Sequence, residues 1–152
     1  MDTIENFRGK YNFLSNFSGH RVKYDGVTWE TSEHAYQAAK THDKDEKTMI
    51  QLCLTPGASK KVGKKITLRN DWDQVKLGIM DRIVHSKFAG NSSLTRKLLA
   101  TEDAEIVETN RWHDNFWGNC TCGSSSCDYP GYNHLGRILM KVRVELEEIR
   151  DA

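Results

Sequence analysis

The segment TSEHAYQAAK, residues 31–40, predicts a short helix with an unusual polar face. It is rich in helix-forming residues, and Thr31 or Ser32 can cap its first turn by accepting a hydrogen bond from a free backbone amide. Residues three, four and seven positions apart share one face of a helix. Four side chains with that spacing bring together a carboxylate, a phenol, a carboxamide and an amine: Glu33, Tyr36, Gln37 and Lys40. Helix statistics alone fit a solvated face as well as a functional one.

Size and charge set the broad class of the protein. A chain of 152 residues suffices for a single domain over residues 1–152 with one hydrophobic core. Its 22 basic and 21 acidic residues leave a net charge of +1, so charge alone does not require a nucleic acid or a membrane as partner. The first ten residues, MDTIENFRGK, lack the apolar core of a secretory signal, and no apolar run is long enough to cross a membrane. We therefore expect a cytoplasmic protein that does not bind membranes. Its oligomeric state is not readable from the sequence.

The segments on either side of residues 31–40 predict an α+β fold, a compact and mainly helical domain with a small antiparallel β component. A hairpin is expected over residues 20–30, because Asp25-Gly26 tolerates the positive φ angles of a tight turn. Residues 7–17 suggest an extended segment in which Phe13, Leu14 and Phe17 are partly buried. Further helices are expected over residues 43–54, over residues 71–88, from residue 91 or 92, and from about residue 133, with a short strand at 105–108. We expect Pro56-Gly57 to end the helix over 43–54.

Several chemical motifs can be judged from the sequence. It contains no GxxxxGK[ST], GxGxxG, HExxH or GxSxG pattern, which argues against the commonest phosphate-loop, dinucleotide, zinc-protease and serine-hydrolase sites. Four lysines lie close together at positions 60, 61, 64 and 65. We favour a solvated basic face for them over a patch that attracts phosphate beside a site.

Three of the four cysteines lie in a Gly/Ser-rich segment, as Cys120, Cys122 and Cys127. Either His113 or His134 would complete a set of four zinc ligands with them. The spacing is irregular and the fourth ligand is ambiguous, so the sequence favours reduced thiols without a metal.

Eight short blocks occur in order along nearly the whole chain: YNFLSNF at 11–17, the Asp25-Gly26 hairpin, TSEHAYQAAK at 31–40, RNDWD at 69–73, KF at 87–88, IVE at 106–108, FWG at 116–118 and NHLGRILMKVR at 133–143. Together they resemble the NADAR family, which includes riboflavin-intermediate N-glycosidases. The resemblance implies a hydrolase of N-glycosidic bonds that needs neither a metal nor a cofactor for its reaction. Its substrates would be ribosylamino-pyrimidine phosphates of riboflavin synthesis, or ADP-ribose attached to guanine in nucleic acid.

The resemblance also assigns roles to residues. N-glycosidic cleavage passes through an oxocarbenium-like ribose, which a nearby carboxylate stabilises. An amine of lowered pKa can instead attack C1′ and form a Schiff base. We predict Lys40 as this amine and Glu33 or Glu108 as the group that activates water, so these three residues form the catalytic set. The predicted substrate-binding residues are Asn16, Phe17, Tyr36, Gln37, Arg69, Trp72, Phe116, Trp117, Gly118 and Asn133.

Some of these residues have an equally simple structural explanation. Trp72 belongs to an apolar helical stripe and is expected in the core, while Trp117 in its loop is as suited to stacking on a base as to packing. Asn133 would also serve as a helix N-cap. The loop at 119–132 varies among family members, which leaves the choice of substrate open. The whole loop of residues 109–132 is long enough to line a dinucleotide-sized groove, which favours ADP-ribosyl conjugates. The alternative function is a module that binds ADP-ribose or another nucleotide without turnover.

Overall fold

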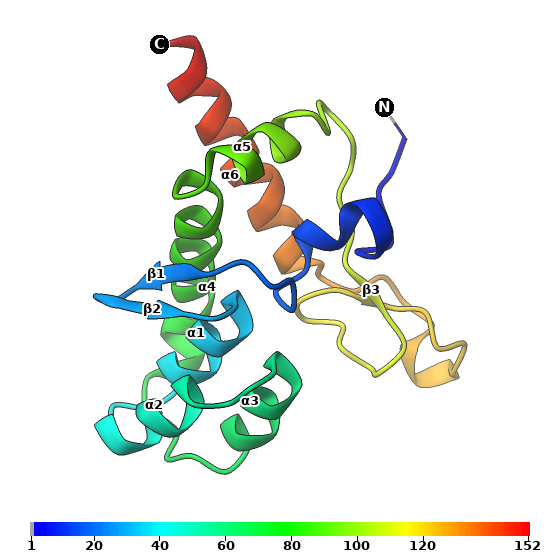
Figure 1. Cartoon of the computed structure of the whole chain (residues 1–152). Helices are drawn as coiled ribbons and strands as arrows, with labels where there is room; N and C mark the ends of the chain where they lie inside the picture. Colours follow the sequence, from blue (N-terminus) through cyan, green and yellow to red (C-terminus); the bar gives the residue numbers. More distant parts are fainter. Residues whose placement is uncertain (1) are drawn as a thin grey trace. The chain divides into compact units, whose positions relative to one another are not determined.

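The computed structural model describes residues 2–152, and its backbone contacts divide them into two units (Figure 1). One unit holds residues 16–91, and the other holds residues up to Ser15 together with Ser92–Ala152. The described elements confirm an α+β chain that is mainly helical with a small antiparallel sheet. The prediction of a single domain remains a prediction.

The unit of residues 16–91 is organised around the predicted hairpin and the helix that follows it. Strands β1 (Val22–Tyr24) and β2 (Val27–Trp29) pair antiparallel, with Asp25 at φ 54° and Gly26 at φ 76° in the turn. Helix α1 (Ser32–Ala39) begins at Thr31, whose hydroxyl accepts a hydrogen bond from the amide of His34. Every residue of α1 is buried, because α1 contacts both strands and three further helices.

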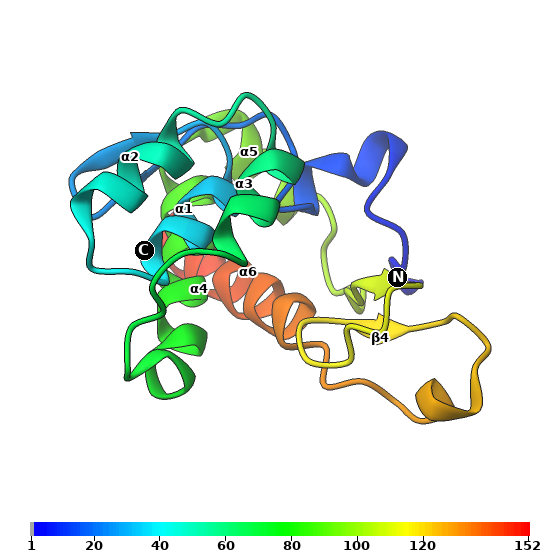
Figure 2. The same cartoon turned by 90° about the horizontal axis from the view of Figure 1, so that it is seen from below.

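The next two helices correct one prediction. Helix α2 (Lys44–Gln51) begins at the predicted Asp43 cap but ends before the predicted residue 54. Pro56 does not merely stop this helix; it opens helix α3 (Pro56–Gly63), which the sequence analysis missed. Proline suits the first helical position, where its missing N–H would have no helical partner anyway. Helices α1, α2 and α3 lie side by side in Figure 2.

Helix α4 (Trp72–Ala89) completes this unit and agrees with the predicted span and apolar stripe. Its buried residues include Ile79, Ile83 and Val84, which recur at helical spacing. It packs against α1 and against β1 (Figure 1).

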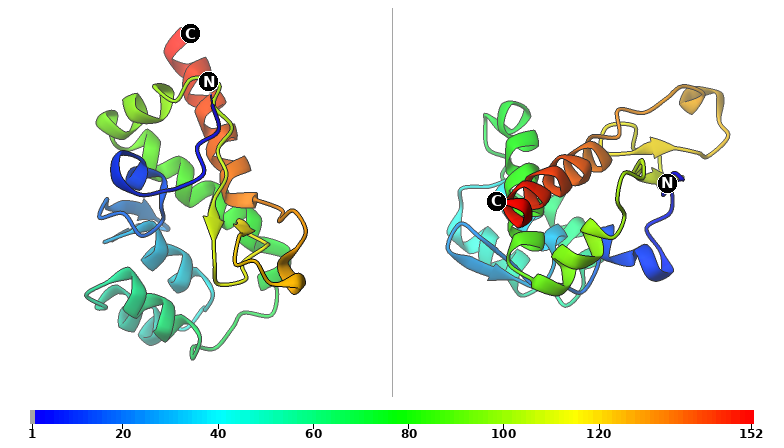
Figure 3. Two further views of the ribbon diagram at one scale, coloured as in Figure 1. Left: turned by 90° about the vertical axis from the view of Figure 1, so that its right-hand side faces the viewer. Right: turned by 90° about the horizontal axis from the view of Figure 1, so that it is seen from above.

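The other unit contains the N-terminal segment and two helices that pack on each other although they are far apart in the sequence. Helix α5 (Ser92–Leu99) packs on helix α6 (His134–Asp151), as Figure 3 shows. The predicted inward side chains of α6 are buried: Leu135, Ile138, Leu139, Val142 and Leu146. Residues Gly9–Leu14 form the 3₁₀ helix η1 rather than the predicted extended segment. Phe13 and Leu14 are buried, more than the partial burial predicted, while Phe17, in the unit of residues 16–91, is 45% exposed and so partly buried as predicted.

The strand predicted at residues 105–108 is reduced to one parallel bridge between Ile4 and Ile106. Strand pairing begins just after this bridge, where β3 (Thr109–Asn110) pairs in parallel with β4 (Asn119–Cys120). The loop that continues from β4 includes the short 3₁₀ helix η2 (Ser125–Cys127) before it reaches α6 (Figure 2). Among residues 2–152, no helix combines the length and the apolar composition needed to cross a membrane.

Candidate active site

The polar face of α1 packs inside the protein, with Glu33, Tyr36 and Gln37 buried and Lys40 half-buried. Glu33 is 7% exposed and Gln37 is 3% exposed. The amide nitrogen Nε2 of Gln37 donates a hydrogen bond to Oε1 of Glu33 over 3.0 Å. The amine of Lys40 lies 5.5 Å from the ring centre of Tyr36, on the same side of the helix. The structure therefore brings together the four side chains that the spacing placed on one face.

Burial shifts the acid and the amine of this cluster toward their uncharged forms. It raises the pKa of the Glu33 carboxyl, while the hydrogen bond from Gln37 and the positive charge of Lys60 oppose the shift. Burial also lowers the pKa of the Lys40 amine; Glu33 opposes this shift, and Lys60 and other lysines reinforce it. A carboxyl that retains a proton and an amine that loses one are the two forms that acid–base and nucleophilic catalysis require.

One oxygen atom in the cluster is buried without a hydrogen-bond partner among the described residues. Within residues 2–152, Oε1 of Gln37 is one of two buried side-chain atoms without a hydrogen-bond partner, the other being Oγ of Ser32. Gly63 of α3 borders the Gln37 side chain so closely that a Cβ there would lie 2.0 Å from this oxygen. A buried acceptor without a donor is rare in proteins, and a substrate hydroxyl would satisfy it.

The predicted binding residues Asn16 and Phe17 precede the hairpin. The backbone oxygen of Asn16 accepts a hydrogen bond from the amide of Glu33 over 3.0 Å, which fixes this segment to the start of α1. The side-chain amide of Asn16 points to the sulfur of Met80, 3.4 Å away. The substrate-binding role of Asn16 stays a prediction.

Tyr36 of α1 contacts Trp72, and Arg69 binds the backbone at the end of this helix. The rings of Tyr36 and Trp72 lie 5.3 Å apart, and Trp72 is 7% exposed, as expected of a core residue. The amide of Arg69 donates to the backbone oxygen of Lys40 over 2.7 Å, while its guanidinium binds the Asp71 carboxylate at 2.6 Å. These contacts hold the C-terminal end of α1 in place, and the substrate-binding roles of the three residues stay predictions.

A buried lysine that the sequence analysis left without a role lies in the same unit. Lys87 is 2% exposed, and its amine donates to Oγ of Ser18 over 3.0 Å. Burial lowers the pKa of Lys87 to about 7. Its spacing from Ile83 and Val84 puts it on the apolar stripe of α4, and a lysine on such a stripe is a signal worth noting in a sequence.

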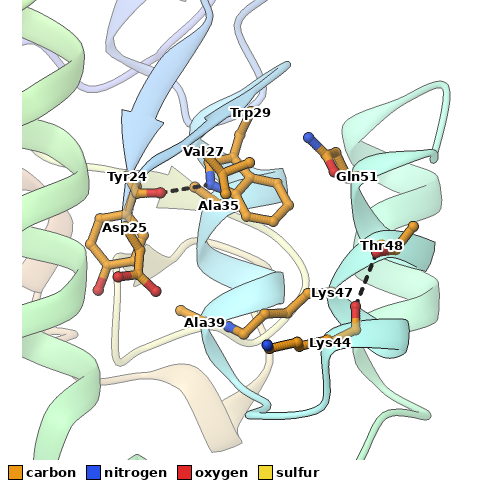
Figure 4. A pocket seen from close by; sticks show the side chains of 10 residues that line it. All are labelled: Tyr24, Asp25, Val27, Trp29, Ala35, Ala39, Lys44, Lys47, Thr48 and Gln51. Carbon is orange, nitrogen blue, oxygen red and sulfur yellow. Dashed lines mark hydrogen bonds between the residues drawn. The ribbon is translucent and has the colours of Figure 1, made fainter.

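A cavity of about 210 Å³ in this unit is lined by residues of the β1–β2 hairpin, α1 and α2 (Figure 4). Its lining includes Ala35 and Ala39, which are turned away from the face of Glu33, Gln37 and Lys40. Lys47 of α2 also lines it and donates to the backbone oxygen of Ala38 over 2.9 Å. None of the predicted site residues borders this cavity.

In the other unit, Glu108 packs directly over Gly118. A Cβ at Gly118 would lie 1.6 Å from Oε2 of Glu108 and 2.3 Å from its backbone oxygen. The side-chain amide of Asn110 donates to the same Oε2 over 3.2 Å. Gly118 is therefore needed for the close approach of its backbone to Glu108, and Asn110 is a polar partner that the sequence gave no reason to single out.

The aromatic pair Phe116 and Trp117 has a fixed backbone. Their amides donate to Oδ1 of Asp114 over 3.0 and 2.8 Å, and their rings meet edge to face with centres 4.8 Å apart. Their backbone oxygens accept hydrogen bonds from the first amides of α6, at His134 and Leu135. Both side chains are half-buried, so each keeps some ring surface available.

Asn133 precedes α6 in a left-handed conformation, with φ 54°, and its side chain does not cap the helix. Instead its Oδ1 accepts from the amide of Glu108 over 2.9 Å, and its Nδ2 donates to the backbone oxygen of Ile106 over 2.9 Å. The predicted N-cap position is right, but the side chain ties α6 to the segment before β3. A substrate contact by Asn133 stays a prediction.

The loop cysteines converge on one histidine. The sulfurs of Cys120, Cys122 and Cys127 and a ring nitrogen of His113 all lie within 4.8 Å of one another. His134, the other candidate ligand, instead stacks on Tyr132 with ring centres 5.3 Å apart.

Comparisons with known proteins agree with the family resemblance. The NADAR domain model matches residues 5–147. The chain is 35% identical over 151 residues to N-glycosidase YbiA of Escherichia coli (strain K12), covering 96% of this chain and 90% of that protein. It is 38% identical over 144 residues to N-glycosidase Npun_R5314 of Nostoc punctiforme, covering 91% of this chain and 88% of the relative.

Two further matches extend this picture. Riboflavin biosynthesis protein VVA0006 of Vibrio vulnificus is 35% identical over 140 residues, which are 91% of this chain and 36% of that longer protein. The NMR structure of E. coli YbiA superposes with a TM-score of 0.83 at 32% identity, covering 99% of this chain and 86% of that one. The chain is accordingly an enzyme, a hydrolase acting on N-glycosyl bonds, and it belongs to the NADAR family.

Proposed function

We propose that this enzyme releases a base from a phosphorylated ribose, with Lys40 and Glu33 at the reacting carbon. The observation that carries the proposal is the buried cluster on α1, where an acid of raised pKa and an amine of lowered pKa share one helix face with Gln37. Two carboxyl or amine groups whose surroundings favour their uncharged forms are the usual mark of acid–base and nucleophilic roles. Lys60, Lys64 and Lys76 are close enough to influence Lys40 and would attract a phosphate group.

The proposed reaction begins with attack of the uncharged Lys40 amine on C1′ of the ribose. The bond between Nζ and C1′ forms while the bond from C1′ to the base nitrogen breaks, and the protonated Glu33 carboxyl gives its proton to the departing base. The ring oxygen then leaves C1′ and takes a proton from Nζ, which opens the ring and leaves a protonated imine between Nζ and C1′. Water adds to the imine carbon and loses its proton to the carboxylate, and release of Lys40 yields the free sugar.

Gln37 would orient the sugar in this reaction. Its Nε2 already holds Glu33, and its Oε1 is a buried acceptor without a donor among residues 2–152. A ribose hydroxyl that donates to this oxygen would place C1′ beside the carboxyl and the amine. Glu108, in the other unit, remains our second candidate for the group that activates water.

ADP-ribose attached to guanine is the first substrate that we propose. The loop of residues 109–132 exposes large aromatic surfaces at Trp112, Tyr129 and Tyr132, which are 57%, 55% and 64% exposed. Exposed aromatic rings suit stacking on the bases of a nucleic acid. The second candidate is the ribosylamino-pyrimidine phosphate of riboflavin synthesis, which the name of the Vibrio vulnificus relative favours.

Separate incubation with an ADP-ribosylated guanine oligonucleotide and with the riboflavin-pathway intermediate tests the choice. We expect base release from the first at a higher kcat/KM than from the second. A reversed ratio would assign the enzyme to the pathway intermediate. Tight binding of ADP-ribose with no base release from either substrate would favour the alternative, a binding module without turnover.

Borohydride treatment during turnover tests the amine independently. An imine on Lys40 would be reduced to a stable adduct, which peptide mass spectrometry would locate. An active enzyme that gives no adduct would exclude the Schiff base and leave direct attack by a water molecule that Glu33 activates.

A further inference from the structure

We infer that His113, Cys120, Cys122 and Cys127 form a structural zinc site. One nitrogen and three sulfur atoms lie within 4.8 Å of one another, although the residues are spread over fifteen positions of a loop. Cys₃His is one of the ligand sets that hold structural zinc in a tetrahedral arrangement. The sequence favoured free thiols because its spacing is irregular and it offered two histidines; the fold selects His113.

The distances match the edges of a zinc tetrahedron. With Zn–S bonds of about 2.3 Å and Zn–N bonds of about 2.05 Å, the sulfur-to-nitrogen edge of a regular tetrahedron is about 3.6 Å. Nδ1 of His113 lies 3.3 Å from Sγ of Cys127, 3.6 Å from Sγ of Cys122 and 3.9 Å from Sγ of Cys120. The three sulfurs thus lie around this nitrogen at about the distance that a shared zinc ion requires.

The backbone around the ligands supports bound thiolates. The amide of Ser124 donates to Sγ of Cys122 over 3.4 Å, and Gly123 permits this turn with φ 84°. Hydrogen bonds from backbone amides to sulfur are a common second layer around metal-bound cysteine. His113 itself has φ 70°, a conformation that a residue with a side chain seldom adopts unless its surroundings enforce it.

The ligand set also indicates what the zinc would do. Four protein ligands fill a tetrahedral zinc ion and leave no position for water or substrate, so the site is structural and takes no part in the glycosidase reaction. His113 and Cys120 bracket the segment that carries Phe116, Trp117 and Gly118. An ion that joins the two ends of this segment would restrict the loop in the same way as a short covalent cross-link.

Metal analysis of the full-length protein, purified with a reductant and zinc in the medium, tests the inference. We expect about one zinc ion per chain. Cys122→Ala and Cys127→Ala should lose this zinc, whereas Cys53→Ala should retain it, because Cys53 lies outside the cluster and donates to the backbone oxygen of Met49. Equal zinc content in Cys127→Ala and Cys53→Ala, or no zinc in the wild type, would overturn the inference.

Cobalt replacement gives a readout that does not depend on a variant folding. The wild-type protein, stripped of metal and loaded with Co²⁺, should show the visible bands of tetrahedral cobalt and the near-ultraviolet bands of thiolate-to-cobalt charge transfer. Excess zinc should remove both sets of bands. Octahedral cobalt bands, or mass spectrometry that finds a disulfide among the three loop cysteines in place of bound metal, would refute the site.

Discussion

The polar face of α1 and the loop of residues 109–132 both hold predicted site residues, but different forces position them. On α1, the helix itself sets the spacing of Glu33, Gln37 and Lys40, and its contacts with neighbouring helices and strands bury the cluster. In the loop, side chains bind the backbone: Asn110 accepts from the amides of Trp112 and Asp114, and Asp114 in turn holds the amides of the two aromatic residues. The first arrangement is periodic and can be read from sequence, while the second depends on contacts that have no period.

A substitution at Lys40 should produce the largest effect on activity. An active variant would mean that the polar face of α1 does not carry the reaction. Lys40→Met removes the proposed nucleophile, and we expect kcat to fall by about 10³-fold. The free energy of unfolding should not decrease, because a half-buried amine of lowered pKa is replaced by an apolar side chain of similar length. Steady-state assays of base release and denaturant unfolding measure the two effects.

The matched control for that experiment is Lys65→Met. Lys65 is exposed, and it is not among the charges that influence Lys40. Its substitution should leave kcat within about twofold. Full activity of Lys40→Met would move the chemistry away from α1.

Lys87 is a second lysine of lowered pKa, but it has no assigned catalytic role and can be compared with Lys40. Lys87→Met should stabilise the protein by about 1–4 kcal/mol at pH 6, because it removes the cost of burying a charge. Its folded pKa of about 7 is below the ordinary 10.5, so between these values the unfolded chain binds more protons than the folded protein. The stability of the wild type should therefore rise with pH through this window and fall as pH drops toward 7.

Unfolding curves of the wild type and Lys87→Met at several pH values check this sign. The difference between them should be greatest below pH 7 and shrink toward pH 10.5, because the folded protein loses the Lys87 proton near pH 7 and the unfolded chain loses it near pH 10.5. A difference that does not change with pH would show that packing, and not charge, sets the effect. Loss of activity in a stable Lys87→Met variant would add Lys87 to the candidate site.

Glu33→Gln separates the catalytic and structural roles of the buried acid. We expect kcat to fall by about 10²-fold, the size usual for a lost acid–base group. Because burial raises the folded pKa of Glu33, the folded protein binds the proton more tightly than the unfolded chain does, and wild-type stability should decline as pH rises through that range. The variant should lack this decline, and thermal unfolding at pH 4 and pH 7 measures the difference. An unchanged kcat would favour Glu108 as the group that activates water.

The smallest expected effect concerns the loop. Gly118→Ala should destabilise the protein by about 2 kcal/mol, because the added Cβ would collide with the side chain and backbone of Glu108. Gly19→Ala is the matched control, since a Cβ at Gly19 meets no atom within 4 Å and its stability should change little. Equal stability of the two variants in chemical unfolding would mean that the backbone around Gly118 shifts at little cost to accommodate the added Cβ.

Regular elements of the fold were the most predictable from sequence. The turn at Asp25-Gly26, the cap at Thr31 and the apolar stripes of α4 and α6 follow from local conformational preference and periodicity. Failures occurred where a local signal had two readings: Pro56 both ends one helix and starts another, and η1 has no repeating apolar pattern. The strand expected at 105–108 shortened to a bridge because its partner, the N-terminal segment, offers a single pairing at Ile4.

The sequence by itself determined that an acid, an amide and an amine share one face of α1, since helical spacing fixes that relation. Only the tertiary structure decided that this face is buried, which is the cause of the shifted pKa values of Glu33 and Lys40. It also decided that His113, and not His134, joins the three thiols, because the path of an irregular loop follows from hydrogen bonds between distant residues and not from spacing along the chain.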